Sequence, residues 1–170
     1  MTEKKWVLMT NDDGIEAPGF EHLVKAMNSA GIPLVAFAPS TNKSACSMQL
    51  NLGKPIDLHN RSELIETWDL DETVGVHLFA LDGTPCDTMI VALDGGLKHV
   101  LPDVEPSLVL SGVNLGPNLS QDSYHSGTMG AAREAGLYGL PAIASSYTSF
   151  DPAGMQLSLI HISEPTRHTR

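Results

Sequence analysis

The chain has 170 residues, of which 42% are hydrophobic, 5% aromatic and 18% charged, a composition typical of one globular domain and not of a disordered chain. Twenty acidic residues against ten Lys and Arg give a net charge of −10. This excess of negative charge argues against a protein that binds duplex nucleic acid.

Cysteine content and hydropathy exclude several other classes. Two cysteines, Cys46 and Cys86, are too few for a disulfide framework or a zinc site. The apolar run at residues 6–9 is too short for a signal-peptide core, and no other run approaches the length of a membrane span. We therefore expect a cytoplasmic protein with no membrane partner.

Short apolar runs alternate with helical patterns along the chain. The sequence predicts buried strands at residues 6–9, 33–38, 107–110 and 141–145, and helices at residues 19–30, 85–93 and 127–137. It also predicts a polar loop at 39–53, a meander of short strands at 55–58, 64–68 and 74–78, and a loop at 111–125. Because the four buried strands are continuously apolar, the expected fold class is α/β: a doubly wound, mostly parallel sheet with helices on both faces, as in a Rossmann-like three-layer domain.

The end of the chain has an unusual sequence. Residues 157–167, LSLIHISEPTR, resemble the translation of a transposase adapter used in sequencing libraries, and an eleven-residue match is very improbable by chance. We therefore expect residues 1–156 to form one incomplete domain that lacks its carboxyl-terminal part, and residues 157–170 to be a non-native tail. The alternative is a genuine short strand at residues 157–162.

Three polar segments follow predicted strands, at the ends where ligands of doubly wound sheets bind. In NDDG at residues 11–14, Gly14 permits the turn that two adjacent carboxylates need to reach one ion, although an Asx turn with a helix cap is the simpler alternative. The segment at 40–44 indicates a loop, and SGVNLGPN at 111–118 indicates close backbone approach.

The predicted helix at 127–137 begins with small residues, in HSGTMGAA at 125–132. Free amide hydrogens at such a helix start, with the hydroxyls of Ser126 and Thr128, form a site for an anion such as phosphate. An ordinary serine cap is the alternative. The segment lacks the ending of a Walker A loop, and the first strand leads into two Asp residues instead of a dinucleotide fingerprint.

Six motifs taken together resemble one family. They are NDDG at 11–14, APG at 17–19, AP-x-x-N-x-S at 38–44, GTP-x-D at 83–87, SGVN-x-GPN at 111–118 and SGT-x-x-AA at 126–132. In this order they resemble the SurE-type survival proteins, which are metal-dependent 5′/3′-nucleotidases. The resemblance spans most of residues 6–146.

The resemblance implies a set of functional residues. One divalent cation, Mg²⁺ or Mn²⁺, is expected to be held by the oxygen ligands Asp12, Asp13, Ser44 and Asn114. Asp12 and Asp13 are the expected catalytic residues in hydrolysis of nucleoside monophosphates, with Asp12 acting as general base or nucleophile. The residues expected to hold the phosphate are Asn11, Asn118, Ser126, Gly127 and Thr128. Asp87 is expected to be structural and His125 to be a loop residue.

The resemblance also implies assembly, because members of the family continue into further strands and an arm that builds a homodimer or homotetramer. We expect this of the full-length form. Two alternative functions stay open. One is an aspartyl-phosphate hydrolase of the haloacid dehalogenase type, although that family separates its two Asp by one residue and needs a later Lys. The other is a non-catalytic nucleotide-binding or assembly module.

Overall fold

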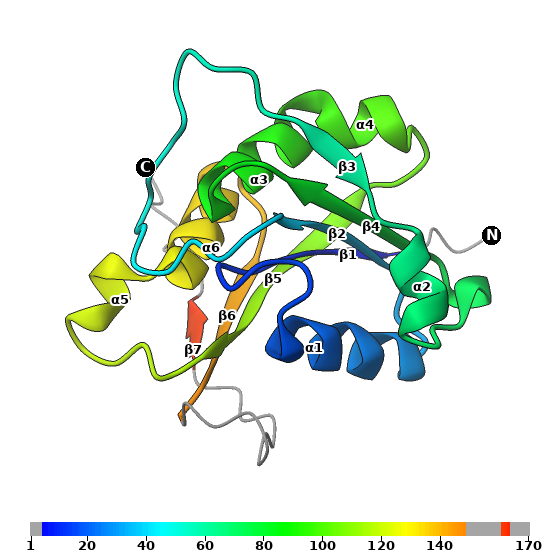
Figure 1. The fold of residues 1–170 in the computed structure, drawn as a ribbon, viewed down its shortest axis with the longest axis horizontal. Helices are drawn as coiled ribbons and strands as arrows, with labels where there is room; N and C mark the ends of the chain where they lie inside the picture. The colour runs from blue at the N-terminus through cyan, green and yellow to red at the C-terminus, as the bar shows by residue number, and fades with distance from the viewer. Residues whose placement is uncertain (1–4, 149–160, 164–170) are drawn as a thin grey trace, which may run out of the picture.

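The computed structural model describes residues 5–148 and 161–163, which contain one seven-stranded sheet (Figure 1). The strands in spatial order are β3 (Leu58–Asn60), β4 (Val76–Leu81), β2 (Leu34–Pro39), β1 (Trp6–Thr10), β5 (Pro106–Leu115), β6 (Ala142–Tyr147) and β7 (His161–Ser163). The five central strands, β4, β2, β1, β5 and β6, are parallel to one another. The edge strands β3 and β7 are antiparallel to their neighbours. The predicted α/β fold with a mostly parallel sheet is confirmed.

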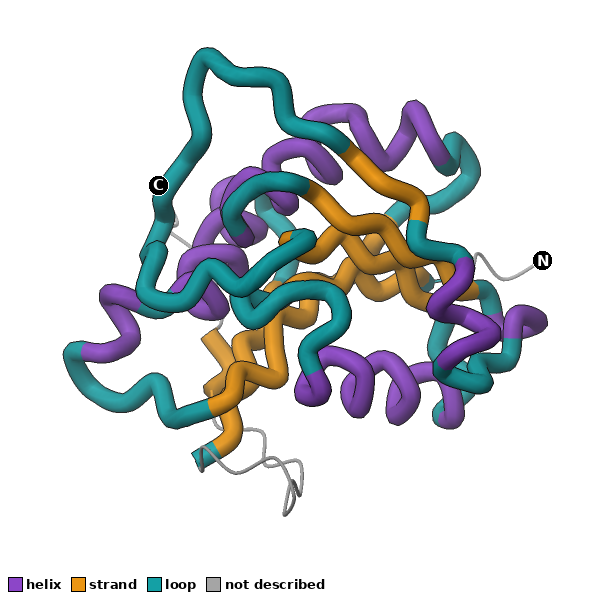
Figure 2. The backbone as a smooth tube through the Cα atoms, viewed as in Figure 1, coloured by secondary structure: helices purple, strands orange, loops and turns teal. Residues whose placement is uncertain are grey.

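Helices cover both faces of this sheet (Figures 1 and 2). The helices are α1 (Pro18–Ser29), α2 (Glu63–Thr67), α3 (Pro85–Val91), α4 (Leu97–Val100), α5 (Asp122–His125) and α6 (Gly127–Leu137), with a 3₁₀ turn η1 (Glu72–Val74) and a π-type turn η2 (Ala92–Gly96). Met9 packs in the apolar cluster under α1 and α2, together with Phe20, whereas Leu8 packs in the cluster under α3 and α6, together with Met89. Since successive strand residues enter opposite clusters, the central strands are apolar throughout.

The prediction of a strand at residues 64–68 is wrong, because this segment forms α2. Leu64 and Trp68, four residues apart, are both buried in the cluster under α1, which is the spacing of one helix face. The main-chain N–H of Ser62 donates to Oδ1 of Asn60 at 2.9 Å and closes the turn before the helix. The predicted meander is therefore a two-stranded antiparallel pair, β3 and β4, with a helix between its strands.

Two other boundaries differ from the prediction. β5 continues to Leu115, so the first part of the predicted 111–125 loop lies in the sheet, and α5 forms one helical turn that ends at His125. The predicted helix at 85–93 ends at Val91, where the chain passes through η2 into α4. Thr84 caps α3, because its hydroxyl accepts a hydrogen bond from the Asp87 N–H.

Only three residues of the predicted non-native tail are described. They form β7, in which His161 pairs with Ala144 and Ser163 with Ala142 at the edge of β6. The rest of residues 157–170 lies outside the described residues. Within residues 5–148 and 161–163, no helix has the length and hydropathy needed to cross a membrane.

The order of the strands determines where a ligand site can form. β2 and β4 lie on one side of β1, and β5 and β6 lie on the other, so the winding of the chain reverses between β1 and β5. Thr10, the last residue of β1, is in register with Ser111 of β5. The NDDG segment and the SGVN segment therefore meet at the switch point of the sheet, where doubly wound proteins bind ligands.

Candidate active site

The chain turns sharply directly after β1. The side-chain amide of Asn11 donates to the carbonyl oxygen of Gly14 at 2.7 Å, and Gly14 has a φ of +104°, which favours glycine. A Cβ on Gly14 would lie 3.3 Å from the carbonyl carbon of Thr41. The loop that follows β2 thus packs directly on this turn.

Asp12 is buried against the start of α6, with 3% of its surface exposed. Its Oδ1 accepts a hydrogen bond of 2.5 Å from the hydroxyl of Thr128. A Cβ on Gly127 would lie 2.8 Å from both Cβ of Asp12 and Sγ of Cys46. Only glycine at position 127 therefore lets α6 approach the carboxylate this closely.

Asp13 is half-buried, and its side chain is directed towards the end of β5. Its Oδ2 accepts a hydrogen bond of 2.9 Å from the main-chain N–H of Leu115, at the end of β5. Its Oδ1 accepts a longer bond of 3.4 Å from the side-chain amide of Asn42. Two adjacent carboxylates are thus oriented by two separate parts of the chain.

The electrostatic surroundings of this pair disfavour negative charge. Burial is the largest cause that raises the pKa of both carboxyls above the ordinary value. For Asp12, hydrogen bonding to Thr128 lowers the pKa, and the neighbouring charge of Asp13 raises it. In residues 5–148 and 161–163, no Lys or Arg forms a salt bridge with either carboxylate. A cation bound beside them would relieve both the desolvation and the mutual repulsion.

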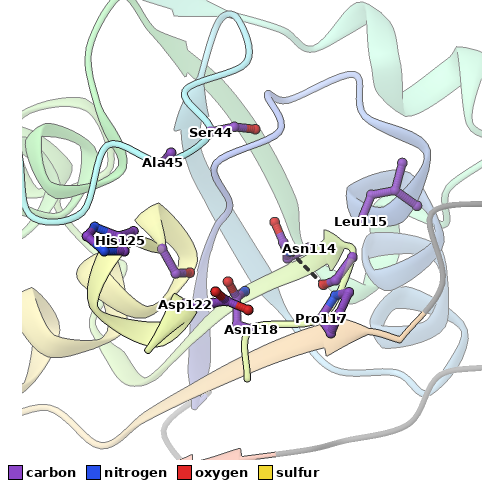
Figure 3. Close-up of a pocket in the computed structure, with 10 residues that line it drawn as sticks. Ser44, Ala45, Asn114, Leu115, Pro117, Asn118, Asp122 and His125 are labelled. Carbon is purple, nitrogen blue, oxygen red and sulfur yellow. Dashed lines mark hydrogen bonds between the residues drawn. The ribbon is translucent and has the colours of Figure 1, made fainter. Parts of the chain in front are cut away.

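A cavity of about 290 Å³ lies next to Leu115, the residue whose N–H binds Asp13, and Figure 3 shows the residues that line it. Its lining residues are Ser44, Ala45, Asn114, Leu115, Gly116, Pro117, Asn118, Asp122, His125 and Ser126. In Figure 3, Ser44 lies across the cavity from Asn114 and Asn118, and His125 lies at the α5 side.

Hydrogen bonds orient several of these lining side chains. The amide of Asn114 donates to the carbonyl oxygen of Gly116 at 2.7 Å, which leaves its Oδ1 available as a ligand oxygen. The amide of Asn118 donates to the hydroxyl of Ser146 at 2.8 Å. The hydroxyl of Ser126 caps α6 by accepting from the N–H of Met129 at 3.1 Å. Part of the cavity wall therefore consists of oxygen and nitrogen atoms that hydrogen bonds hold in place.

The loop after β2 brings Ser44 to the same place. The N–H of Lys43 donates to the main-chain oxygen of Asp12 at 2.7 Å, and the N–H of Ser44 donates to Oδ1 of Asn42 at 2.8 Å. A second cavity of about 220 Å³ lies on the other side of Leu115 and is lined by Asp13, Ala17, Pro18, Gly19, Asn42 and Leu115.

Some of the predicted site residues line one of the two cavities, and the others line neither. Ser44, Asn114, Asn118 and Ser126 line the larger cavity, and Asp13 lines the smaller one. Asn11, Asp12, Gly127 and Thr128 are buried and do not line either cavity. The last three contact one another, and Asn11 closes the turn that carries the two carboxylates.

Some residues of the candidate site were not predicted from the sequence. Asp122 and His125 line the cavity from α5, a turn that the sequence presents as loop. Asn42 binds both Asp13 and the N–H of Ser44, and the Asn-x-Ser spacing of an Asx turn is the signal that indicates it. No sequence pattern indicates that the N–H of Leu115 binds Asp13, because every residue except proline carries the same donor.

Comparisons with known proteins find one matching protein family. The profile of a protein family described as Survival protein SurE matches residues 7–169. A protein named 5′-nucleotidase SurE from Paramagnetospirillum magneticum is 36% identical over 146 residues, and one from Desulfitobacterium hafniense is 39% identical over 144 residues. These matches cover 86% and 85% of this chain, but 50% and 51% of the two relatives.

A solved structure is also similar. The crystal structure of the SurE protein from Aquifex aeolicus has a TM-score of 0.66 and 33% sequence identity, and the match covers 85% of this chain and 51% of that chain. The chain thus spans about half the length of the relatives that it matches. From the extent of the family match and its agreement with the fold, the chain belongs to the survival protein SurE family.

Proposed function

We propose that the chain carries the site of a divalent-cation-dependent phosphomonoesterase that hydrolyses nucleoside 5′- or 3′-monophosphates to nucleoside and phosphate. The observation that carries the proposal is the pair Asp12 and Asp13, which are adjacent and desolvated and lie at the switch point of the sheet, where Asp13 is bonded to Leu115 in the wall of the larger cavity. The relatives named 5′-nucleotidase SurE support the substrate class.

The chemistry of the donors fits a hard cation. Asp12, Asp13, Ser44 and Asn114 offer carboxylate, hydroxyl and amide oxygens, the ligands that suit Mg²⁺ and Mn²⁺. Among the residues that the structure describes, no group of three or more His, Cys, Asp and Glu is placed to hold a metal. A site here therefore depends on neutral oxygens in addition to two carboxylates, which disfavours zinc.

The remaining chemistry belongs to side chains of this chain. When bound, the cation polarises the phosphoryl oxygens and stabilises the charge that develops on them. Thr128 holds one oxygen of Asp12, and the Leu115 N–H holds one oxygen of Asp13, so that both carboxylates keep one orientation. Asn118 and Ser126, which line the cavity, contact the phosphate in this proposal.

Asn11, Gly127 and Thr128 then act on the phosphate indirectly, by shaping the surroundings of Asp12. Asp12 itself serves as general base or as nucleophile in this proposal. Trapping of a phosphorylated chain after a short incubation with substrate distinguishes these roles, because only a nucleophile forms the covalent species.

Phosphate release from nucleoside monophosphates tests the proposed function. We expect the full-length form to release phosphate with Mn²⁺, and the release to stop when excess chelator is added. Asp12→Asn and Asp13→Asn are expected to lower the rate by about 10²-fold or more. Asp103→Asn, which makes the same charge change at an exposed position, is the matched control. Full turnover in excess chelator would refute the proposal, and nucleotide binding without turnover would indicate a non-catalytic binding module.

We also propose that the full-length form assembles as a homodimer or homotetramer, in line with the family resemblance. Light scattering of the full-length form after size-exclusion chromatography measures the mass directly, and a monomer would contradict this part of the proposal.

A further inference from the structure

We propose that Asp87 is a positioning residue of the candidate site: it fixes the far end of the loop between β2 and β3 and thereby holds Ser44 at the cavity. The inference rests on the proposed function, which gives Ser44 to the cation. Asp87 itself is not a lining residue of the cavity of about 290 Å³.

The loop that carries Ser44 has unfavourable backbone conformations. It runs from the end of β2 at Pro39 to the start of β3 at Leu58, and forms the long teal segment in Figure 2. Directly after Ser44, the non-glycine residues Ala45 and Ser47 have φ values of +57° and +52°. Left-handed conformations of such residues persist only where surrounding contacts hold them. The path of the loop past Ser44 therefore depends on its anchors.

One set of anchors lies near Ser44. The N–H of Lys43 donates to the main-chain oxygen of Asp12 at 2.7 Å. The N–H and hydroxyl of Ser47 donate to the carbonyl oxygens of His125 and Tyr124, at 2.9 and 2.6 Å. These bonds tie the loop to the turn after β1 and to α5.

Asp87 supplies the anchor at the far end. This side chain is buried, with 4% of its surface exposed, and it accepts hydrogen bonds from the N–H of Asn51 at 3.1 Å and from the Asn51 side-chain amide at 2.7 Å. The Asp87 carboxylate also accepts a hydrogen bond of 2.8 Å from the main-chain N–H of Thr84. The hydroxyl of Thr84 in turn donates a hydrogen bond of 2.6 Å to the carbonyl oxygen of Gln49. Hydrogen bonds to a carboxylate are stronger than bonds between neutral groups.

The apolar side chains in this part of the loop are only partly buried. Met48, Leu50 and Leu52 expose 36%, 39% and 80% of their surfaces. Since these side chains are only partly buried, the polar bonds to Asp87 and Thr84 hold the segment between Ser47 and Asn51, together with the hydrogen bond of 3.0 Å from the Gln49 N–H to the carbonyl oxygen of Cys46. Loss of that anchor would free the strained residues that follow Ser44.

The closing experiment compares two asparagine variants of the full chain. Asn51→Ala removes the side-chain bond to Asp87 without changing α3. The matched control is Asn28→Ala, because Asn28 also joins a helix to a loop, with two bonds to Asp71 of 3.0 and 2.8 Å, and lines neither cavity. Mn²⁺ affinity is measured by electron paramagnetic resonance, and hydrogen exchange is measured at the amides of Lys43 and Ser47.

We expect Asn51→Ala to weaken Mn²⁺ binding about tenfold, the order expected for loss of a hydrogen bond to a charged group, and to speed exchange at both amides. Asn28→Ala should leave both readouts unchanged even where it lowers the thermal midpoint. Asp87→Asn should resemble Asn51→Ala, and the exchange variant Asn51→Asp/Asp87→Asn should recover part of the lost affinity, because amide and carboxylate still face each other.

Each outcome decides a separate question. Unchanged Mn²⁺ affinity and unchanged exchange in Asn51→Ala would overturn the positioning role of Asp87. A wild-type chain that does not bind Mn²⁺ would contradict the proposed function, and the exchange comparison would still decide whether Asp87 holds the loop.

Discussion

The hydroxyl of Thr128 donates a hydrogen bond of 2.5 Å to Oδ1 of Asp12, a residue 116 positions earlier in the chain. Thr128 is completely buried, and Asp12 is almost so. The bond joins the start of α6 to the turn after β1, so the orientation of this carboxylate depends on the contact between two distant segments.

Removing that hydroxyl should destabilise the fold. Thr128→Val keeps the shape of the side chain but leaves a buried carboxylate oxygen without its donor, so we expect the free energy of unfolding to fall by about 1–3 kcal/mol. The pKa of Asp12 should rise further, since Thr128 now lowers it. Urea denaturation measures the change. Thr128→Ser, which keeps the hydroxyl, is the control, and a Thr128→Val variant as stable as the wild type would contradict this role.

Two glycines of α6 provide a matched pair. A Cβ on Gly127 would lie 2.8 Å from Asp12 and from Cys46, whereas a Cβ on Gly136 would meet no atom within 4 Å. We expect Gly127→Ala to displace Asp12 and to lower Mn²⁺ affinity by about tenfold or more. Gly136→Ala should stabilise the helix by about 0.5–1 kcal/mol and leave Mn²⁺ binding unchanged. Calorimetric titration with Mn²⁺ and thermal unfolding check both, and equal affinities would show that the contact is not needed.

The pKa values of the two carboxyls predict how stability depends on pH and metal. Both pKa values are raised above 3.8 in the folded state, so the folded chain binds these protons more tightly than the unfolded chain. Their contribution favours folding at low pH and is lost as the pH rises through the raised values. At pH 7 without metal, Asp13→Asn should therefore be at least as stable as the wild type.

Added Mn²⁺ should reverse that order at pH 7. We expect it to raise the thermal midpoint of the wild type but not of Asp13→Asn, and to have less effect as the pH falls towards the raised pKa values, because protons compete with the metal. Thermal unfolding at several pH values measures this. An increment from Mn²⁺ that is the same at every pH would argue against binding by these carboxylates.

A backbone donor can be tested with proline. Leu115→Pro removes the N–H that holds Asp13, whereas Leu115→Ala keeps it. We expect Leu115→Pro to weaken Mn²⁺ binding about tenfold or more and Leu115→Ala to change it less than threefold. Similar affinities for the two variants would mean that this bond does not orient the carboxylate.

Much of the fold is predictable from the sequence because burial on both faces leaves continuous apolar runs, as in β1 and β2. The prediction fails at residues 64–68, where Leu64 and Trp68 match a helix face as well as an alternating strand in so short a segment. It also ends β5 too early, since Ser111 and Gly112 read as loop residues although they are buried in the sheet.

The candidate site is predictable in its segments but not in its contacts. The NDDG and SGVN segments meet as expected, because the strand order places β1 beside β5. That Thr128 faces Asp12 and not the cavity depends on how α6 packs, which no local pattern of residues records. The anchor from Asp87 to Asn51 likewise joins two segments whose spacing in the sequence carries no signal.

The main-chain N–H groups of Lys43 and Leu115 bind Asp12 and Asp13 without using the side chains of Lys43 and Leu115 themselves. A substitution at either position therefore keeps the same donor for almost any residue except proline. Positions 87 and 128 have no such latitude, because their own side-chain oxygens make the bonds. Random mutagenesis with selection for Mn²⁺ binding should accordingly return many substitutions at positions 43 and 115 and few at positions 87 and 128.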